Sequence, residues 1–325
     1  MRSRYLSQRC LSIVAVALAI ASFQVTMVEA SDRIDVIVPL GEGGALDHFA
    51  RTAQRFLNNG TDLEVSVENF SPKNGQDGYR EFLDRPADGS TVLAWFEPAV
   101  AAYGPGASLD DLTIINVQEI EPPILAVRSD LGWRNLSEMV AALRRTPNRY
   151  RFGYGSATAG GSILTTALLN NLGLKIVAAG YRSGGKARKA VAKGDVDFTA
   201  GSLKALQKMG DRIAPLAVFS HRRLRAWPEV PTIMEALGPE ANQAVHGAVY
   251  RFFAVHRAFS ESEPEAFAKL VEAFRHMTEE DPAFLRNASE RGVGARWFGP
   301  VESTSLLQRS HQHFSQLIAR QRTHY

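Results

Sequence analysis

The clearest change in hydrophobic pattern lies near the start of the chain, over residues 34–57. Residues 34–38 form a short apolar run rich in β-branched side chains, typical of a strand buried on both faces. Glycines at positions 41, 43 and 44 then free the backbone to turn sharply. From Asp47 the apolar residues recur with the spacing of one helix face. The pattern predicts a strand, a glycine turn and a helix whose unpaired N–H groups suit a phosphate or carboxylate.

The same arrangement recurs in the middle of the chain. Residues 150–154 predict a strand, residues 155–161 (GSATAGG) a small-residue turn, and residues 162–172 a helix with Ser162 as its N-cap. Further periodic segments predict strands at 64–68, 91–96, 124–128, 175–179, 195–200, 213–219 and 249–255, and helices at 79–83, 135–145, 186–193, 264–277 and 303–320. Strands that alternate with helices indicate parallel sheets with crossover helices, so we expect two α/β units.

Each glycine turn taken alone is a weak signal. Neither turn has the G-x-G-x-x-G spacing or the G-x-x-x-x-G-K-[ST] motif of nucleotide-binding loops. An ordinary connection in an α/β domain would look the same. Two such turns that face each other across a cleft, however, would hold a small anion from both ends, at the strand ends where α/β sheets bind ligands.

The first thirty residues have the features of a secretory signal peptide. Arg2, Arg4 and Arg9 precede an apolar run over residues 11–21, and the small-residue pattern that ends at Ala30 suits cleavage there. The alternative is a retained membrane anchor, but the run is shorter than the roughly 20 residues that span a bilayer. We therefore expect cleavage after Ala30 and a periplasmic protein.

Removal of this segment changes the net charge of the chain. The full chain has 37 Lys and Arg against 34 Asp and Glu; without the three Arg and one Glu of residues 1–30 it is close to neutral. The charge therefore gives no argument for binding nucleic acid. The single cysteine, Cys10, lies in the predicted signal peptide, so no disulfide is expected in the mature chain.

Five segments in order resemble the extracytoplasmic solute receptors of tripartite tricarboxylate transporters, also called Bug proteins. They are VIVPLGEGGALDHFAR from Val36; Val67-Glu68-Asn69 leading to Ala87-Asp88-Gly89-Ser90-Thr91; Phe152 to Ala157; Tyr181-Arg182 to Asp197; and Pro228 to Thr232 with Glu235. The resemblance extends from about Ile34 to the C-terminus. No single segment is decisive, and the order of the five is what identifies the family.

This resemblance implies a type II periplasmic-binding-protein fold with a ligand cleft between two α/β domains. Domain I would comprise residues 31–125 and 248–325, and domain II residues 126–247. The chain would cross between domains near 117–127 and 246–250. A monomeric receptor would bind a small organic carboxylate, close its domains like a hinge and offer the closed form to integral-membrane permease subunits. Catalytic residues, metal and cofactor are not expected.

In the family, backbone amides of the two glycine loops and ordered waters hold the carboxylate. We expect Gly43 and Gly44 to donate N–H groups, and Asp47 to cap the helix or orient a water. The full set of candidate ligand-binding residues is Gly43, Gly44, Asp47, Phe96, Glu97, Ser156, Thr158, Gly161, Ser162, Arg182 and Arg251. Asp197, which lies in a predicted strand, is expected to be structural.

Several positions depart from the family pattern. Trp95, Phe96 and Glu97 stand where small or hydroxylated residues are usual, so the rings either fill the cleft, stack on a ligand or pack in the core. The negative charges of Glu42 and Glu97 would repel an anionic ligand unless the two side chains point to solvent, contact a cationic group of the ligand or are balanced by basic side chains. Candidates for that offset are Arg182, Lys186 and Arg251, although the basic residues 186–193 also suit a solvated helix face. The family often has His at the position of Leu164.

Two other functions remain open at this point. A secreted enzyme on the same fold would use Ser156 or Asp47, but Ser156 does not lie in a G-x-S-x-G motif. A receptor that feeds a signalling partner has the same sequence features as a transport receptor. His311 and His313 are two residues apart and diverge on a helix, so they predict a surface helix and no metal site.

Overall fold

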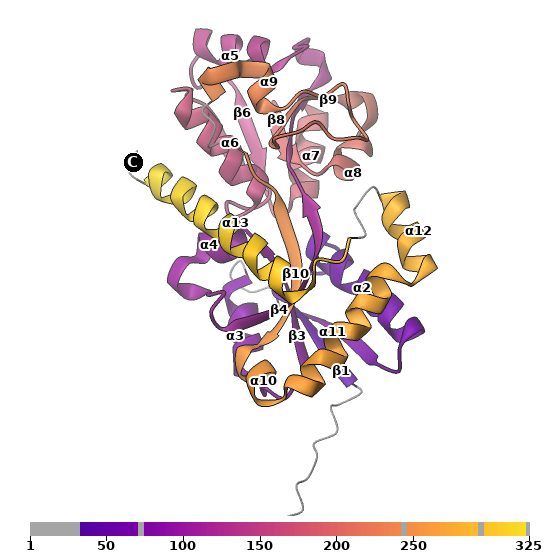
Figure 1. The fold of residues 1–325 in the computed structure, drawn as a ribbon. Coiled ribbons are helices and arrows are strands. Elements are labelled where there is room, and N and C mark those ends of the chain that lie inside the picture. Colours follow the sequence, from indigo (N-terminus) through magenta and orange to yellow (C-terminus); the bar gives the residue numbers. More distant parts are fainter. Residues whose placement is uncertain (1–32, 71–74, 242–245, 292–295, 323–325) are drawn as a thin grey trace, which may run out of the picture. The chain divides into compact units, whose positions relative to one another are not determined.

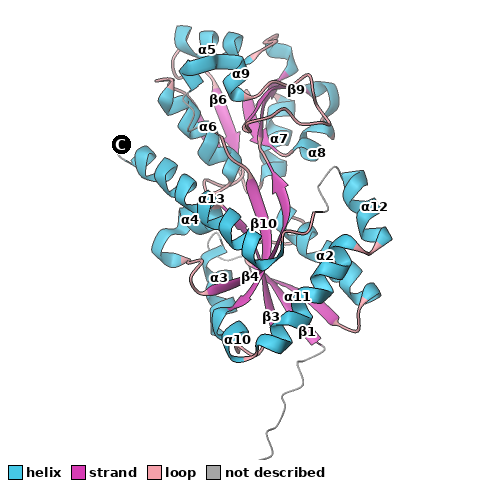
Figure 2. Cartoon of the chain, viewed as in Figure 1, coloured by secondary structure: helices cyan, strands magenta, loops and turns pink. Residues whose placement is uncertain are grey.

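The computed structural model describes residues 33–70, 75–241, 246–291 and 296–322. The predicted signal peptide, its cleavage site and Cys10 lie outside the described residues. Figure 1 shows the chain with its elements labelled, and Figure 2 colours them by type. The strands are β1 (Arg33–Val38), β2 (Glu64–Asn69), β3 (Thr91–Glu97), β4 (Leu112–Glu121), β5 (Ile124–Arg128), β6 (Arg151–Tyr154), β7 (Val177–Gly180), β8 (Phe198–Gly201), β9 (Ile213–Val218) and β10 (Val249–His256).

Helices alternate with these strands along most of the chain. They are α2 (Ala45–Gly60), α3 (Gln76–Asp84), α4 (Ala99–Tyr103), α5 (Leu136–Arg145), α6 (Gly160–Asn171), α7 (Gly184–Lys193), α8 (Leu203–Gln207), α9 (Ile233–Leu237), α10 (Arg257–Ser262), α11 (Pro264–Glu279), α12 (Pro282–Arg291) and α13 (Gly299–Arg322). The predicted alternation of strands and helices, that of an α/β fold, is thereby confirmed.

The first sheet, sheet A, has the strand order β2-β1-β3-β10-β4. β1 pairs in parallel with β2 and β3, and β10 is antiparallel to β3 and β4. The carboxyl ends of β1, β2 and β3 therefore share one edge with the start of β10. Residues Phe96, Arg251 and Glu119 pair directly across β3, β10 and β4, so their side chains share one face of the sheet.

The second sheet, sheet B, has the order β7-β6-β8-β5-β9. β6 is parallel to β7 and β8, and β5 is antiparallel to β8 and β9. Ile124, which starts β5, pairs with Gly201, which ends β8. The carboxyl ends of β6, β7 and β8 thus share an edge with the start of β5.

Two connections join the sheets. The chain leaves β4 at Glu121 and enters β5 at Ile124, and it returns to sheet A at Val249. The Phe219 N–H donates to the Pro123 carbonyl, and the Gly247 N–H donates to the Phe219 carbonyl, so the two connections are tied together. Domain boundaries at 125/126 and 247/248 stay a prediction, although β5 as a whole pairs within sheet B.

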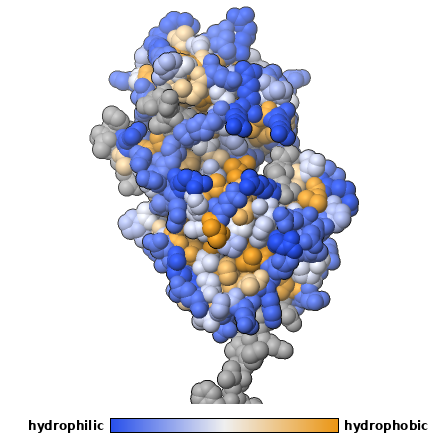
Figure 3. All heavy atoms as spheres, in the orientation of Figure 1, coloured by the Kyte–Doolittle hydropathy of each residue, from blue (hydrophilic) through white to orange (hydrophobic). Residues whose placement is uncertain are grey.

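Each sheet has its own hydrophobic core. Phe49, Trp95 and Phe253 are fully buried around sheet A, and Phe198 and Phe219 around sheet B. Helix α13 contributes to both, with Leu307 in the first core and Phe314 and Leu317 in the second. Figure 3 shows polar side chains over much of the visible face, with apolar patches between them.

The Ser162 N-cap is wrong, Asp197 has its predicted structural role but lies outside the strand, and one strand was not predicted. Helix α6 begins at Gly160 with Ala159 as its N-cap, so Ser162 is not the cap. Asp197 lies one residue before β8; its carboxylate accepts the Arg151 N–H at 2.7 Å and Arg128 Nε at 3.1 Å, which is a structural role. β4 was not predicted because buried polar residues, among them Asn116, Gln118 and Glu119, interrupt its apolar pattern.

Candidate functional site

Among the helices that begin at the carboxyl edges of the two sheets, α2, α6 and α7 have glycine-rich starts. α2 follows β1, α6 follows β6 and α7 follows β7, and each start contains consecutive glycines. The first N–H groups of such helices have no partner within the helix and carry the positive end of the helix dipole. The fold therefore collects several N–H donors that favour negative charge at these edges.

In the first loop, the Asp47 side chain is already engaged. Its carboxylate accepts the Gly43 N–H at 2.9 Å and Arg51 Nε at 2.8 Å, and the residue is buried. The N–H of Gly43 is therefore occupied, whereas Gly44 is the N-cap of α2. Gly43 has φ of +72°, where a side chain would be strained, so this glycine is needed for the turn itself.

The second loop is held by its own hydroxyl groups. The Ser156 and Thr158 hydroxyls lie 2.8 Å apart, and the Thr158 N–H donates to Ser156 Oγ at 3.2 Å. A Cβ at Gly155 would lie 2.0 Å from the Gly184 backbone N. Only glycine at 155 therefore lets the β6–α6 loop pack against the start of α7.

Residues of the two sheets meet at this loop. The Tyr103 side chain, at the end of α4, interacts with the Thr158 side chain, while burial raises the pKa of Tyr103. A Cβ at Gly160 would lie 3.0 Å from Val249 Cγ2 and 3.4 Å from Pro98 Cδ. The start of α6 thus packs closely against the residues that follow β3 and begin β10.

An arginine of α7 lies at the same edge. A Cβ at Gly184 would be 3.2 Å from Arg188 Nη1, and one at Gly201 would be 3.6 Å from the same atom. The Arg188 guanidinium therefore folds back over the start of its own helix and the end of β8. The residue is half-buried, and burial lowers the pKa of Arg188 while the Glu121 carboxylate opposes that shift.

Arg251 is committed to two carboxylates within sheet A. Its Nη1 lies 2.8 Å from Glu119 Oε2 and 3.1 Å from Glu121 Oε2. Burial lowers the pKa of Arg251, but the two carboxylates outweigh it and raise that pKa overall. Arg251 therefore offsets Glu119 and Glu121, and its role toward a ligand stays a prediction.

The residues that depart from the family pattern fall into different environments. Trp95 is fully buried against Tyr79 and Tyr103, so this ring packs in the core. Phe96 is only partly buried, and Glu42 is exposed to solvent. Glu97 is fully buried, and its Oε1 lies 3.4 Å from His311 Nδ1, a histidine that was not among the predicted basic candidates.

A family model described as "Tripartite tricarboxylate transporter family receptor" matches residues 64–321. The chain belongs to this family. The receptor is 29% identical over 246 residues to the UPF0065 protein of the tcbD–tcbE intergenic region of Pseudomonas sp. strain P51, which covers 71% of each chain. Its identity to protein BugT of Bordetella pertussis is 26% over 216 residues, which covers 64% of this chain and 66% of BugT.

Solved structures share the fold of the receptor. An R. palustris protein solved with adipate has a TM-score of 0.76 and 21% identity, and covers 89% of this chain and 97% of that one. MatC of Rhodopseudomonas palustris with bound malate has a TM-score of 0.75 and 18% identity, and covers 88% and 98%. The predicted family and the type II periplasmic-binding-protein fold are confirmed.

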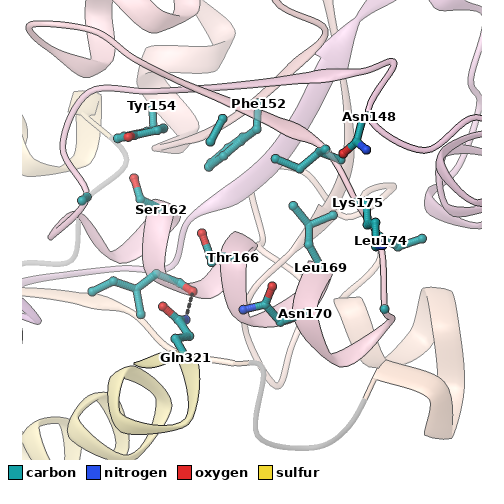
Figure 4. Close-up of a pocket in the computed structure, with 15 residues that line it drawn as sticks. Asn148, Phe152, Tyr154, Ser162, Thr166, Leu169, Asn170, Leu174, Lys175 and Gln321 are labelled. Carbon is teal, nitrogen blue, oxygen red and sulfur yellow. Dashed lines mark hydrogen bonds between the residues drawn. The ribbon is translucent and has the colours of Figure 1, made fainter. Parts of the chain in front are cut away.

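Two predicted residues of α6, Gly161 and Ser162, have different neighbours. Gly161 packs against β8, where a Cβ would be 3.0 Å from Ala200 Cβ. Ser162 lines an open groove of about 780 Å³ between α6 and strands β6 and β7 (Figure 4). Phe152, Tyr154 and Thr166 also face this groove, and Gln321 donates to the Ile163 carbonyl at its rim. Ser162 therefore lines the same groove as Ala157, which lies between Ser156 and Thr158 in the chain.

The remaining candidates separate by exposure. Arg182 and Lys186 are exposed, whereas Arg188 of the same segment is half-buried at the sheet edge. Arg188, Tyr103 and Gly155 were not among the predicted site residues. The sequence pattern around Arg188 did not indicate a binding role, because four basic residues on one helix are typical of a helix face exposed to solvent. Within the described residues, no three side chains are arranged to hold a metal ion.

Among the described residues, none of the helices combines the length and apolar character that crossing a bilayer requires.

Proposed function

We propose that this receptor binds a small organic carboxylate between its two sheets, in the periplasm, and presents the bound form to the permease subunits of its transporter. The observation that carries the proposal is the convergence of helix starts at the sheet edges, with Tyr103 of one unit against Thr158 of the other. The relatives solved with adipate and malate support a carboxylate ligand.

The N–H groups at the starts of α6 and α7 would hold the carboxylate. In α6 the first N–H groups, those of Gly160 and Gly161, have no partner within the helix. In the first loop, Asp47 would fix the turn through the Gly43 N–H and leave the start of α2 open. Hinge movement at the two connections would then close the cleft around the ligand.

We also propose that the receptor has no catalytic activity and acts as a monomer. The Ser156 hydroxyl is bonded to Thr158, and none of the interactions of the described residues joins it to a histidine or carboxylate that could activate it. Such a hydroxyl is a hydrogen-bonding group for a ligand and not a nucleophile.

A thermal-shift and calorimetry screen of residues 31–325 tests the proposal. The panel contains mono-, di- and tricarboxylates, aromatic acids and amino acids. A ligand at 100 times its Kd should add about 2.7 kcal/mol of stability. Ser156→Asp should weaken binding by at least about tenfold, because its carboxylate can still accept the Thr158 N–H but repels an anion.

Ser129→Asp is the matched control. Ser129 is exposed and follows β5, at the edge of sheet B opposite to the end of β8. The same charge placed there should leave the Kd within about twofold, since exposed charges more than a Debye length away are screened. Equal losses in both variants would contradict the assignment of the second loop, and no response to any carboxylate would contradict the function.

A further inference from the structure

Arg188 occupies a position that its own helix does not require. α7 carries Lys186, Lys189 and Lys193 as exposed cations, as expected for a solvated face. Arg188 instead turns toward the N-terminal end of α7, where its guanidinium lies beside Gly184, Gly185 and Gly201. These glycines leave room that side chains would otherwise fill, so the guanidinium reaches the carboxyl edge of sheet B.

The guanidinium has no hydrogen-bond or ion-pair partner among the described residues. An arginine has five N–H donors, and burial without acceptors is costly for a charged group. The Glu121 carboxylate acts on the charge of Arg188, yet the ion pair that Glu121 makes is with Arg251. A half-buried cation with free donors at a ligand-binding edge is suited to an anionic partner from outside the chain.

The surrounding charges have consequences for the kind of ligand. Glu119, Glu121 and Arg251 together carry one net negative charge, which opposes an anion beside them. Arg188 brings the formal charge of this cluster to zero and thereby removes the net repulsion of an anion. A carboxylate held only by the helix N-termini does not need Arg188, whereas a second anionic group near β4 would.

We propose that Arg188 binds an anionic group of the ligand directly and selects for ligands that carry a second such group. This inference rests on the proposed carboxylate-binding function. It differs from recognition by backbone amides, since a guanidinium binds a carboxylate through two parallel N–H donors and the interaction disappears with the side chain.

Calorimetry with matched pairs of ligands tests the inference: succinate with butyrate, glutarate with valerate, and adipate with hexanoate. The wild type should prefer the diacid of each pair. Arg188→Gln should weaken diacid binding roughly 10- to 100-fold, as for the loss of a hydrogen bond to a charged group, and change monoacid binding by less than about threefold. Arg188→Lys should give an intermediate loss, because it keeps the charge without the paired donors.

Lys189→Gln is the control, since it removes an exposed cation one residue away and should leave both Kd values within about twofold. Equal losses for diacid and monoacid in Arg188→Gln, or a wild type without diacid preference, would overturn the inference. If Arg188→Gln lowers the melting temperature but keeps the preference for diacids, Arg188 only balances the charge of Glu121, and the inference is overturned. A wild type that binds no carboxylate would overturn the proposed function as well.

If Arg188→Gln does not fold, Glu121→Gln supplies an independent measurement. This variant removes the negative charge that acts on Arg188 and keeps an oxygen for Arg251. Diacid binding should tighten more than monoacid binding. Unchanged diacid binding would overturn the proposal.

Discussion

Glu97 brings an ionisable carboxyl group into the interior of the protein at the end of β3. It is fully buried, and neither of its oxygens has a hydrogen-bond partner among the described residues. Burial raises the pKa of Glu97, and the Glu97 carboxylate, 3.4 Å away, raises the pKa of His311. Each group therefore holds its proton more tightly in the folded chain than in the unfolded one.

Both shifts have the same consequence for stability. A raised pKa in the folded state contributes stability at low pH that is lost as pH rises. The contribution of Glu97 should decline above its ordinary value of 4.5, and that of His311 above its ordinary value of 6.5. The joint contribution of Glu97 and His311 to the free energy of unfolding of the ligand-free protein should therefore decrease as pH rises from these values into the mildly alkaline range.

Glu97→Gln should remove this component, because it removes the buried carboxyl group and the charge that raises the His311 pKa. The melting temperature of the variant minus that of the wild type, measured across this pH range, should increase as pH rises. Glu42→Gln is the control, since Glu42 is an exposed carboxylate and should leave the wild-type profile unchanged. A constant difference between the Glu97→Gln and wild-type curves would contradict the coupling.

At the scale of elements, the pairing of β10 with β4 depends on a charge cluster. Arg251 on β10 bonds Glu119 and Glu121 on β4, and Arg251 and Glu119 are buried. Removal of one partner from a buried ion pair costs more than the pair contributes, because the remaining charge is left desolvated. The cluster therefore fixes strand register and also limits which substitutions the sheet tolerates.

Arg251→Met should lower the free energy of unfolding by about 3 kcal/mol, because two carboxylates would remain close together without their cation. Urea denaturation monitored by circular dichroism measures this change. Arg275→Met is the matched control, since Arg275 pairs with three glutamates on an exposed helix surface and should cost at most about 1 kcal/mol. Similar costs for the two variants would mean that the β10–β4 cluster is effectively solvated.

At the scale of the whole described chain, α13 connects the two hydrophobic cores. Ser303 accepts the Val117 N–H at 2.8 Å on sheet A, while Phe314 is fully buried in the core of sheet B. A Cβ at Gly247 would lie 2.9 Å from Phe314 Cζ, so the helix also packs on the return connection to β10. The packing of α13 thus stabilises both units and the connection between them.

Phe314→Ala should lower the free energy of unfolding by about 3–5 kcal/mol, the usual cost of deleting a fully buried phenyl group. Urea denaturation of residues 31–325 measures the loss. Leu285→Ala, on the surface of α12 with the side chain 36% exposed, should cost much less. A loss in Phe314→Ala no larger than this control would show that α13 is dispensable for the core of sheet B.

Local patterns by themselves determined most elements of this protein and its family. The run at residues 34–38 and the helical spacing after Asp47 depend on nearby residues only, so β1 and α2 were predictable. The starts of helices were less predictable. Ser162 belongs to a residue type that often caps helices, but α6 begins two residues earlier, at Gly160. There Gly160 and Gly161 pack against distant residues, namely Pro98, Val249 and Ala200.

The partners of charged residues were decided only by the tertiary structure. Arg188 and Lys189 are adjacent in sequence, yet only Arg188 reaches the end of β8. Glu97 meets His311 although the two lie far apart in the chain, and Arg251 meets Glu119 only through the pairing of β10 with β4. The physical reason is that periodicity depends on neighbours within a few residues, whereas desolvation and ion pairing depend on which distant segments fold together.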